Sequence, residues 1–145
     1  MKVLVQKVLS ASVTVEQQVV AAIESGFLLF VGVEKGDTPD KADYLAKKVA
    51  NFRIFTDEND KMNLSIQDVN GAILAVSQFT LAADLSRGNR PGFDTAAAPQ
   101  DAEPLYEYFV KQLRSYNLEV QTGIFQADMK VSLVNDGPCT FILQK

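Results

Sequence analysis

The chain has 145 residues, of which 47% are hydrophobic and 22% charged, an ordinary composition for one globular domain of about 100–200 residues. It contains no histidine and a single cysteine, Cys139, which excludes Ser-His-Asp and Cys-His catalysis, the HExxH zinc site and an intrachain disulfide. The formal net charge of −4 argues against a protein that coats nucleic acid by bulk electrostatics, but it leaves room for one RNA end docked in a pocket.

The first third of the chain is predicted to form strands. β-Branched residues recur with period two over residues 3–9 and 11–16, the pattern of half-buried strands. A turn at Gln17-Gln18 leads into a third strand over residues 19–24. The apolar run 27–34 indicates a more fully buried strand.

Two helices are predicted among the later strands. Thr38-Pro39 has the pattern of an N-cap followed by a first-turn proline, and apolar residues at helical spacing follow it. Pro99 opens the second helix, which has Leu105, Phe109 and Leu113 on one face. Short strands are expected at residues 53–55, 72–79, 118–121, 129–134 and 140–143.

This order of elements predicts an α/β fold. We expect a mixed, partly barrel-like β-sheet with two helices packed on one side, in a single domain over residues 1–145. No apolar run reaches the ~18 residues of a membrane span, and the N-terminus has no signal-like apolar region. We therefore expect a cytoplasmic protein that does not enter a membrane.

Residues 77–81, Ser-Gln-Phe-Thr-Leu, form the first segment with chemical potential. They lie where a buried strand is predicted to open into a loop, and from there hydroxyls and backbone N–H groups can face a cleft. The alternative is that Ser77 and Thr80 only satisfy backbone groups at the strand end.

The second segment, residues 135–140, is a strong turn signal between two predicted strands because it reads Asn-Asp-Gly-Pro-Cys-Thr. On spacing alone it indicates no more than a connecting turn, and the general frequency of X–Pro bonds favours the trans form.

The third segment is a long predicted loop over residues 83–98, and loops of this length are often functional. Arg87 and Arg90 stand beside glycines and can clamp a phosphate or carboxylate with forked N–H groups. The alternative is that these arginines are solvated, or paired with Asp84 and Asp94.

Two further features of the sequence have simple interpretations. Cys139 is interpreted as a small buried apolar residue, because no histidine is present to activate its thiol. Phe125, Ala127 and Met129 suit an apolar slot for a base or ring, with core packing as the alternative. No carboxylate set supports a metal site, so no metal is predicted.

Two of these segments closely resemble the signature motifs of D-aminoacyl-tRNA deacylases. They are Ser-Gln-Phe-Thr-Leu-Ala-Ala-Asp at residues 77–84 and Val-Asn-Asp-Gly-Pro at residues 134–138. The likeness extends along the chain through residues 11–15, 32–35, 52–55, 61–64, 121–123 and 127–129.

The resemblance implies a homodimeric, cytoplasmic editing enzyme that uses no metal or other cofactor. Such enzymes hydrolyse the ester that joins a D-amino acid, or glycine mischarged on tRNA-Ala, to the 3′-terminal ribose of tRNA. In the family the Gly-Pro pair, here Gly137 and Pro138, is cis and reaches across the dimer into the partner's active site. Its carbonyl oxygens would meet the substrate amino group and leave no room for an L side chain, which is discrimination by exclusion.

The same resemblance gives roles to the first segment. Gln78, Phe79 and Thr80 are the predicted catalytic residues, and Ser77 would bind substrate beside them. Backbone N–H groups of Phe79 and Thr80 would stabilise the oxyanion that forms when the ester is attacked. The terminal adenine of the D-aminoacyl-tRNA would lie near Phe125, Ala127 and Met129.

The nucleophile is left open between two routes. Thr80 can attack covalently, but no base stands at a recognisable position to deprotonate it. The route that suits a chain without histidine has the 2′-OH of the tRNA position or activate water, and we favour this substrate-assisted route.

Three residues depart from the family pattern. Lys7 stands where arginine is expected, which keeps the charge but loses the bidentate fork. Gly92 replaces an expected serine, and Cys139 replaces a valine of similar volume. Lys7 and Gly92 sustain an alternative function: a non-catalytic module that binds a nucleotide or a D-amino acid on the same fold.

Overall fold

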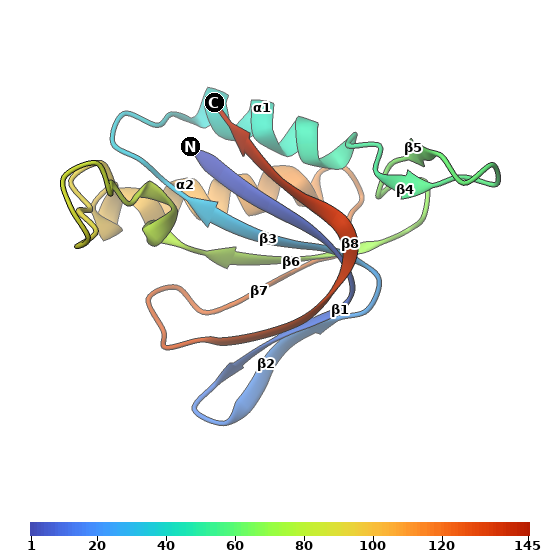
Figure 1. Cartoon of the computed structure of the whole chain (residues 1–145), viewed down its shortest axis with the longest axis horizontal. Helices are drawn as coiled ribbons and strands as arrows, with labels where there is room; N and C mark the ends of the chain where they lie inside the picture. The colour runs from blue at the N-terminus through green and yellow to red at the C-terminus, as the bar shows by residue number, and fades with distance from the viewer.

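The fold is seen in a computed structural model that describes all 145 residues (Figure 1). In chain order its elements are β1 (Lys2–Val15), β2 (Gln18–Ile23), β3 (Gly26–Gly32), α1 (Pro39–Ala50), β4 (Phe55–Thr56), β5 (Met62–Leu64), β6 (Ala72–Ser77), the 3-10 helix η1 (Phe79–Ala82), α2 (Pro99–Arg114), β7 (Val120–Thr122) and β8 (Lys130–Gln144).

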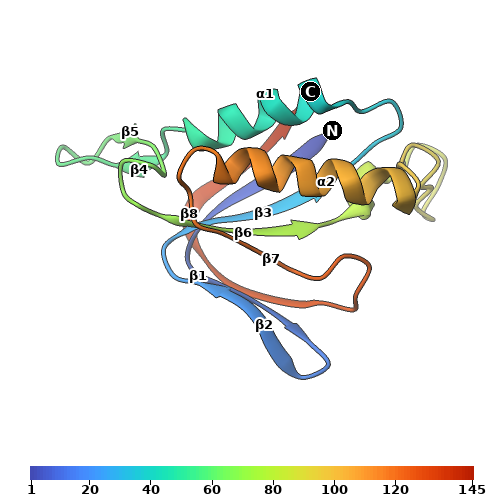
Figure 2. The ribbon, with the colours of Figure 1, turned by 180° about the vertical axis from the view of Figure 1, so that it is seen from behind.

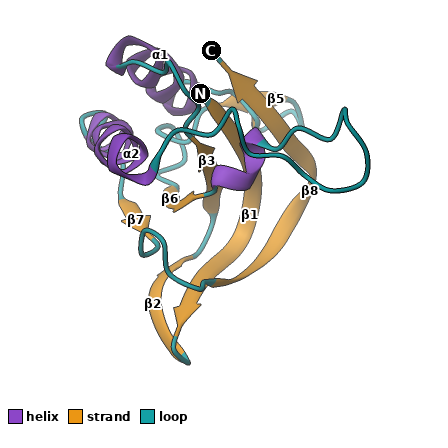
Figure 3. Cartoon of the chain, turned by 90° about the vertical axis from the view of Figure 1, so that its left-hand side faces the viewer, coloured by secondary structure: helices purple, strands orange, loops and turns teal.

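One six-stranded sheet forms the body of the molecule. Its strands run in the order β2-β1-β3-β6-β7, and β8 pairs with β1 outside this path. β1 is antiparallel to its three partners, whereas β6 is parallel to both β3 and β7. The sheet curls strongly along β1 and β8, so that it is nearly closed into a barrel (Figure 3). The predicted mixed, partly barrel-like sheet is confirmed.

The two helices lie side by side on one side of the sheet, as predicted (Figures 1 and 2). α1 turns Leu45 and Val49 inward, and α2 turns Phe109 and Leu113 inward, where all four side chains are fully buried. The main core therefore lies between the helices and the sheet. None of the helices is long and apolar enough to cross a membrane.

β1 and β8 are longer than the sequence predicted. The strands expected at residues 3–9 and 11–16 are one continuous strand, because bulges absorb the irregularities and no turn interrupts them. The turn expected at residues 135–140 lies inside β8. Gln6 pairs with Thr140 and Val8 pairs with Asn135, so the residues between these pairs form a bulge on β8.

Smaller differences occur around β6. The predicted strand over residues 72–79 ends at Ser77, and η1 begins at Phe79. This early end depends on Gly32 of β3. A Cβ atom there would lie 2.9 Å from Leu81 Cβ and 3.1 Å from the carbonyl oxygen of Gln78, so only glycine lets η1 pack this closely on β3. β5 was not predicted, and β4 starts two residues later than the strand expected at 53–55.

Candidate functional site

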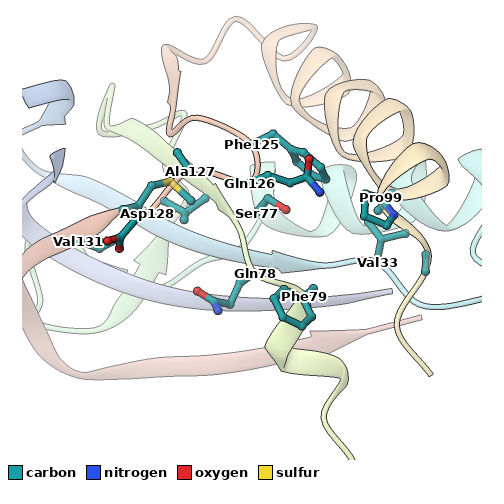
Figure 4. Close-up of a pocket in the computed structure, with 14 residues that line it drawn as sticks. Val33, Ser77, Gln78, Phe79, Pro99, Phe125, Gln126, Ala127, Asp128 and Val131 are labelled. Carbon is teal, nitrogen blue, oxygen red and sulfur yellow. The ribbon is translucent and has the colours of Figure 1, made fainter. Parts of the chain in front are cut away.

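A cavity of about 660 Å³ opens where β6 ends (Figure 4). Its lining comes from three parts of the chain: the end of β6 with η1, the start of α2, and the segment between β7 and β8. The lining residues are Val33, Val76, Ser77, Gln78, Phe79, Ala97, Pro99, Ala102, Phe125, Gln126, Ala127, Asp128, Met129 and Val131. Nine of the fourteen are hydrophobic, so the cavity suits a ring or base beside a few polar groups.

The polar wall of the cavity is the turn from β6 into η1. The Gln78 N–H donates to the carbonyl oxygen of Val31, 2.8 Å away, and this fixes the turn to β3. The Gln78 side-chain amide donates to the Thr80 hydroxyl. No side chain caps the start of η1, and the first N–H groups of a 3-10 turn have no acceptor within it. The N–H groups of Phe79 and Thr80 therefore have no acceptor within the turn and remain free for another hydrogen-bond partner.

The Phe79 ring forms the rim of this wall. It is 56% exposed and meets the Phe93 ring edge to face, with the ring centroids 5.0 Å apart. Since Phe93 belongs to the long loop over residues 83–98, this contact joins the base of that loop to the mouth of the cavity.

The apolar wall is held in place from behind by α2. Phe125 packs against Tyr106, whose ring centroid is 6.2 Å away, and the Tyr106 hydroxyl donates to the Ala75 carbonyl oxygen at 2.9 Å. Burial raises the pKa of Tyr106 well above its usual range, so the hydroxyl remains a neutral donor. A Cβ at Gly123 would lie 2.5 Å from Met129 Sδ, so this glycine makes space for Met129.

The structure brings six of the nine predicted site residues into this cavity. They are Ser77, Gln78, Phe79, Phe125, Ala127 and Met129. Thr80 is exposed and lies outside the lining, with its hydroxyl turned to Gln78. Gly137 and Pro138 also lie outside it.

Gly137 and Pro138 lie in the β8 bulge, on a different part of the sheet. The bulge is level with Lys7 of β1, which pairs with Phe27 of β3 and through it with Ile73 of β6. The path from the bulge on β8 to Ile73 on β6 crosses three strand spacings, roughly 14 Å across the sheet. Ser77, at the cavity, lies four residues beyond Ile73, roughly 13 Å along the strand. Within one chain, the two resembling motifs do not meet.

The bulge itself is firmly held. The Lys7 ammonium lies 2.8 Å from the Asp136 carboxylate and 5.4 Å from the centre of the Phe55 ring. The Asn135 side-chain amide donates to the carbonyl oxygens of Lys7 and Cys139, and the Gly137–Pro138 peptide bond is cis.

The thiol of Cys139, the last residue of this bulge, is buried. Cys139 is 2% exposed and belongs to the main core, which confirms the interpretation of its thiol as a small apolar group. No group of three or more acidic or cysteine side chains is arranged to hold a metal ion.

The arginines of the long loop make no ion pair. Arg87 and Arg90 are exposed, and neither has a carboxylate oxygen within 4.0 Å. Asp84 instead accepts the N–H of Ser86 at 2.8 Å, and its hydrogen bonds from Ser86 lower the pKa of Asp84. The pairing with Asp84 and Asp94, one of the two alternatives for these arginines, is absent.

Sequence reasoning missed part of the cavity lining. Pro99 and Ala102 lie at the start of α2, and only the tertiary packing of α2 brings them to β6. Gln126 has φ 61°, and Gln126 and Asp128 line the cavity between residues that were predicted. The alternation of apolar and polar residues over 125–129 is the signal that could have found them.

Comparisons with known proteins agree over the whole chain. The family described as D-Tyr-tRNA(Tyr) deacylase matches residues 4–144. A D-aminoacyl-tRNA deacylase of Geotalea uraniireducens (strain Rf4) is 58% identical over 144 residues, which are 99% of this chain and 93% of that protein. The D-aminoacyl-tRNA deacylase of Pelobacter propionicus (strain DSM 2379 / NBRC 103807 / OttBd1) is 56% identical over 145 residues, 100% of both chains.

Two solved structures have similar folds. One, described as c-Myc DNA Unwinding Element Binding Protein, has a TM-score of 0.94 at 38% identity and covers 100% of this chain and 99% of its own. Another, described as a probable eukaryotic D-amino acid tRNA deacylase, has a TM-score of 0.82 at 16% identity, covering 98% of this chain and 97% of its own. The second likeness shows the fold alone.

Proposed function

We propose that this chain, which belongs to the D-Tyr-tRNA(Tyr) deacylase family, hydrolyses the ester bond of D-aminoacyl-tRNA and releases the free D-amino acid and tRNA. Residues 1–145 act as a single deacylase domain, and the reaction takes place in the cytoplasm. Glycyl-tRNA mischarged on tRNA-Ala is a second substrate.

The observation that carries this proposal is the cavity at the end of β6. It joins an uncapped backbone turn to an apolar wall, and its volume of about 660 Å³ is in the range of small-molecule sites, about 300–1,000 Å³. The terminal adenine lies against Phe125, Ala127 and Met129. The ester then faces the turn at Ser77 to Thr80.

The oxyanion is stabilised by backbone groups. Attack on the ester places negative charge on the carbonyl oxygen, and the N–H groups of Phe79 and Thr80 receive it without reorganising. Gln78 orients this turn, because its own N–H is bonded to β3 and its side chain to Thr80.

The nucleophile is water, assisted by the 2′-OH of the terminal ribose. The chain has no histidine, and the side chain hydrogen-bonded to the Thr80 hydroxyl is the Gln78 amide, which donates this bond and cannot act as a base. Thr80→Ala should therefore keep substantial activity, whereas a tRNA ending in 2′-deoxyadenosine should react poorly. Loss of activity in the variant, together with indifference to the deoxy substrate, would instead establish Thr80 as the nucleophile.

Chiral selection comes from a second copy of the chain. In the homodimer, Gly137 and Pro138 of one protomer enter the cavity of the other, present carbonyl oxygens to the amino group and exclude an L side chain. The distance between the bulge and the cavity within one chain supports this arrangement in trans. The Lys7–Asp136 ion pair supports a fixed orientation of the bulge.

The decisive experiment compares D-tyrosyl-tRNA with L-tyrosyl-tRNA as substrates. We expect hydrolysis of the D ester alone, and equal hydrolysis of both or of neither contradicts the proposal. Tight binding of a non-hydrolysable D-aminoacyl-adenosine mimic, without turnover of the ester, would favour the non-catalytic binding module instead. Size-exclusion chromatography with light scattering tests the homodimer.

A further inference from the structure

The long loop over residues 83–98, beside the cavity, has two exposed arginines that form no ion pair within the chain. Asp84 and Gly92 exchange backbone hydrogen bonds of 2.8 and 2.9 Å, which close residues 85–91 into a tip. Every residue of this tip is exposed, including Arg87 and Arg90. We call residues 84–92 the arginine loop.

The arginine loop keeps its two cations apart from its acids. Asp84 lies at the base and its carboxylate is bonded to Ser86, while Asp94 lies outside the closing pair. Neither acid is within ion-pair distance of Arg87 or Arg90. The two guanidinium groups therefore keep all of their forked N–H donors for an external anion.

The arginine loop is also attached to the rim of the cavity. Phe93, directly after it, packs on Phe79, and the Thr95 hydroxyl donates to the carbonyl oxygen of Ala82 in η1 at 2.6 Å. The loop, η1 and the segment between β7 and β8 lie at the same end of the molecule (Figures 1 and 2). An RNA strand whose last nucleotide enters the cavity must leave past this end.

The overall charge makes a local basic contact important. With a net charge of −4, the protein as a whole does not attract a polyanion. Binding of an RNA end therefore depends on cations placed beside the path of its backbone.

We propose that Arg87 and Arg90 bind backbone phosphates of the single-stranded RNA that precedes the terminal adenosine. This inference rests on the proposed function, because it takes the occupant of the cavity to be the 3′ end of tRNA. The arginines hold the strand and do not contact the ester, so they act on tRNA binding and not on the chemical step.

The test measures RNA binding directly, as fluorescence anisotropy of labelled, uncharged tRNA over a range of salt concentrations. Arg87→Ala/Arg90→Ala should weaken binding at low salt by on the order of tenfold. The slope of log K against log salt should fall by about 1.4, since each single-strand phosphate contact contributes about 0.7. Arg87→Lys/Arg90→Lys should retain most of the slope.

A matched control removes the same charge elsewhere. Lys47 and Lys48 are exposed and lie near the end of α1 that leads to β4, opposite the arginine loop (Figure 1). Lys47→Ala/Lys48→Ala should leave the slope within about 0.3 of the wild-type value. If the arginine variant keeps the wild-type slope, or if both double variants lose the same slope, the inference is overturned.

An activity measurement separates this inference from the proposed function. The arginine variant should cleave D-tyrosyl-adenosine at the wild-type rate, but its kcat/KM for D-tyrosyl-tRNA should fall about tenfold, mainly through KM. A wild-type protein that cleaves neither substrate refutes the proposed function, and the anisotropy measurement still decides on the arginines.

Discussion

The turn at the end of β6 and the bulge in β8 are the two regions that most resemble known motifs, yet they differ in what they can do alone. The turn has a cavity beside it and backbone N–H groups without a side-chain cap. The bulge lines none of the larger cavities, and it is held by Lys7 and Asn135. One chain thus contains the cavity and, separately, a bulge that lies outside it, which is why the proposed site needs a second chain.

Complementation between two variants is the strongest test of whether the cavity of one chain works with the bulge of another. Ala127→Trp should fill the cavity, and Gly137→Val should change the shape of the β8 bulge. Each substitution should lower kcat by at least about 100-fold. If, as proposed, each protomer of a mixed dimer places its bulge in the cavity of the other, mixing the two variants should restore about a quarter of wild-type activity. Activity is measured on D-tyrosyl-tRNA after subunit exchange.

The control for complementation is each variant exchanged with itself, which should stay inactive. Thermal unfolding should show that both variants are folded. No recovery in the mixture of two folded, dimeric variants would mean that cavity and bulge do not act in trans.

A smaller loss is expected from the apolar wall. Phe125→Ala removes the ring that packs on Tyr106 and that is proposed to stack on the adenine. KM for D-tyrosyl-adenosine should therefore rise roughly tenfold, since base stacking on an aromatic ring contributes about 1–3 kcal/mol. Phe125→Tyr keeps the ring and serves as the control. An unchanged KM in the alanine variant would place the base elsewhere.

The ion pair of the bulge should affect selection more than rate. Lys7→Met leaves Asp136 without its cation, so the preference for D over L ester should fall by roughly fivefold while the cavity stays intact. Lys7→Arg should keep the preference. The ratio of kcat/KM values for the two enantiomers is the measurement, and an unchanged ratio in Lys7→Met would remove the ion pair from the account of selection.

The smallest effect is expected at Cys139, the last residue of the bulge. Cys139→Val replaces a buried apolar group with another of similar volume, so the free energy of unfolding should change by less than about 1 kcal/mol. Activity should stay within about twofold of wild type. A large loss of activity in a variant of normal stability would show a chemical role for the thiol.

The sequence predicted one part of the cavity lining and missed another. Ser77 to Phe79 could be found because a run of buried β residues stops there and polar ones follow, and Phe125 to Met129 because apolar residues alternate. Pro99 and Ala102 could not, since their place in the cavity depends on how α2 packs against the sheet and leaves no local trace.

The β8 bulge shows a different limit. Asn135 to Pro138 has the composition of a turn, and a bulge needs the same backbone freedom as a turn. Only the pairing of β8 with β1 on both sides of these residues distinguishes the two. Periodicity within one strand contains no information about such a partner, so the distance between the two motifs could not be predicted.

β1 runs past both regions. Lys7 holds the bulge, and Val13, six residues further along, packs in the same apolar cluster as Met129 of the cavity. The stretch of β1 from Lys7 to Val13 therefore sets a spacing of roughly 20 Å between the bulge and the cavity wall at Met129. A one-residue insertion there would turn one set of side chains to the opposite face. Variation among relatives within this stretch of β1 should therefore be confined to substitutions.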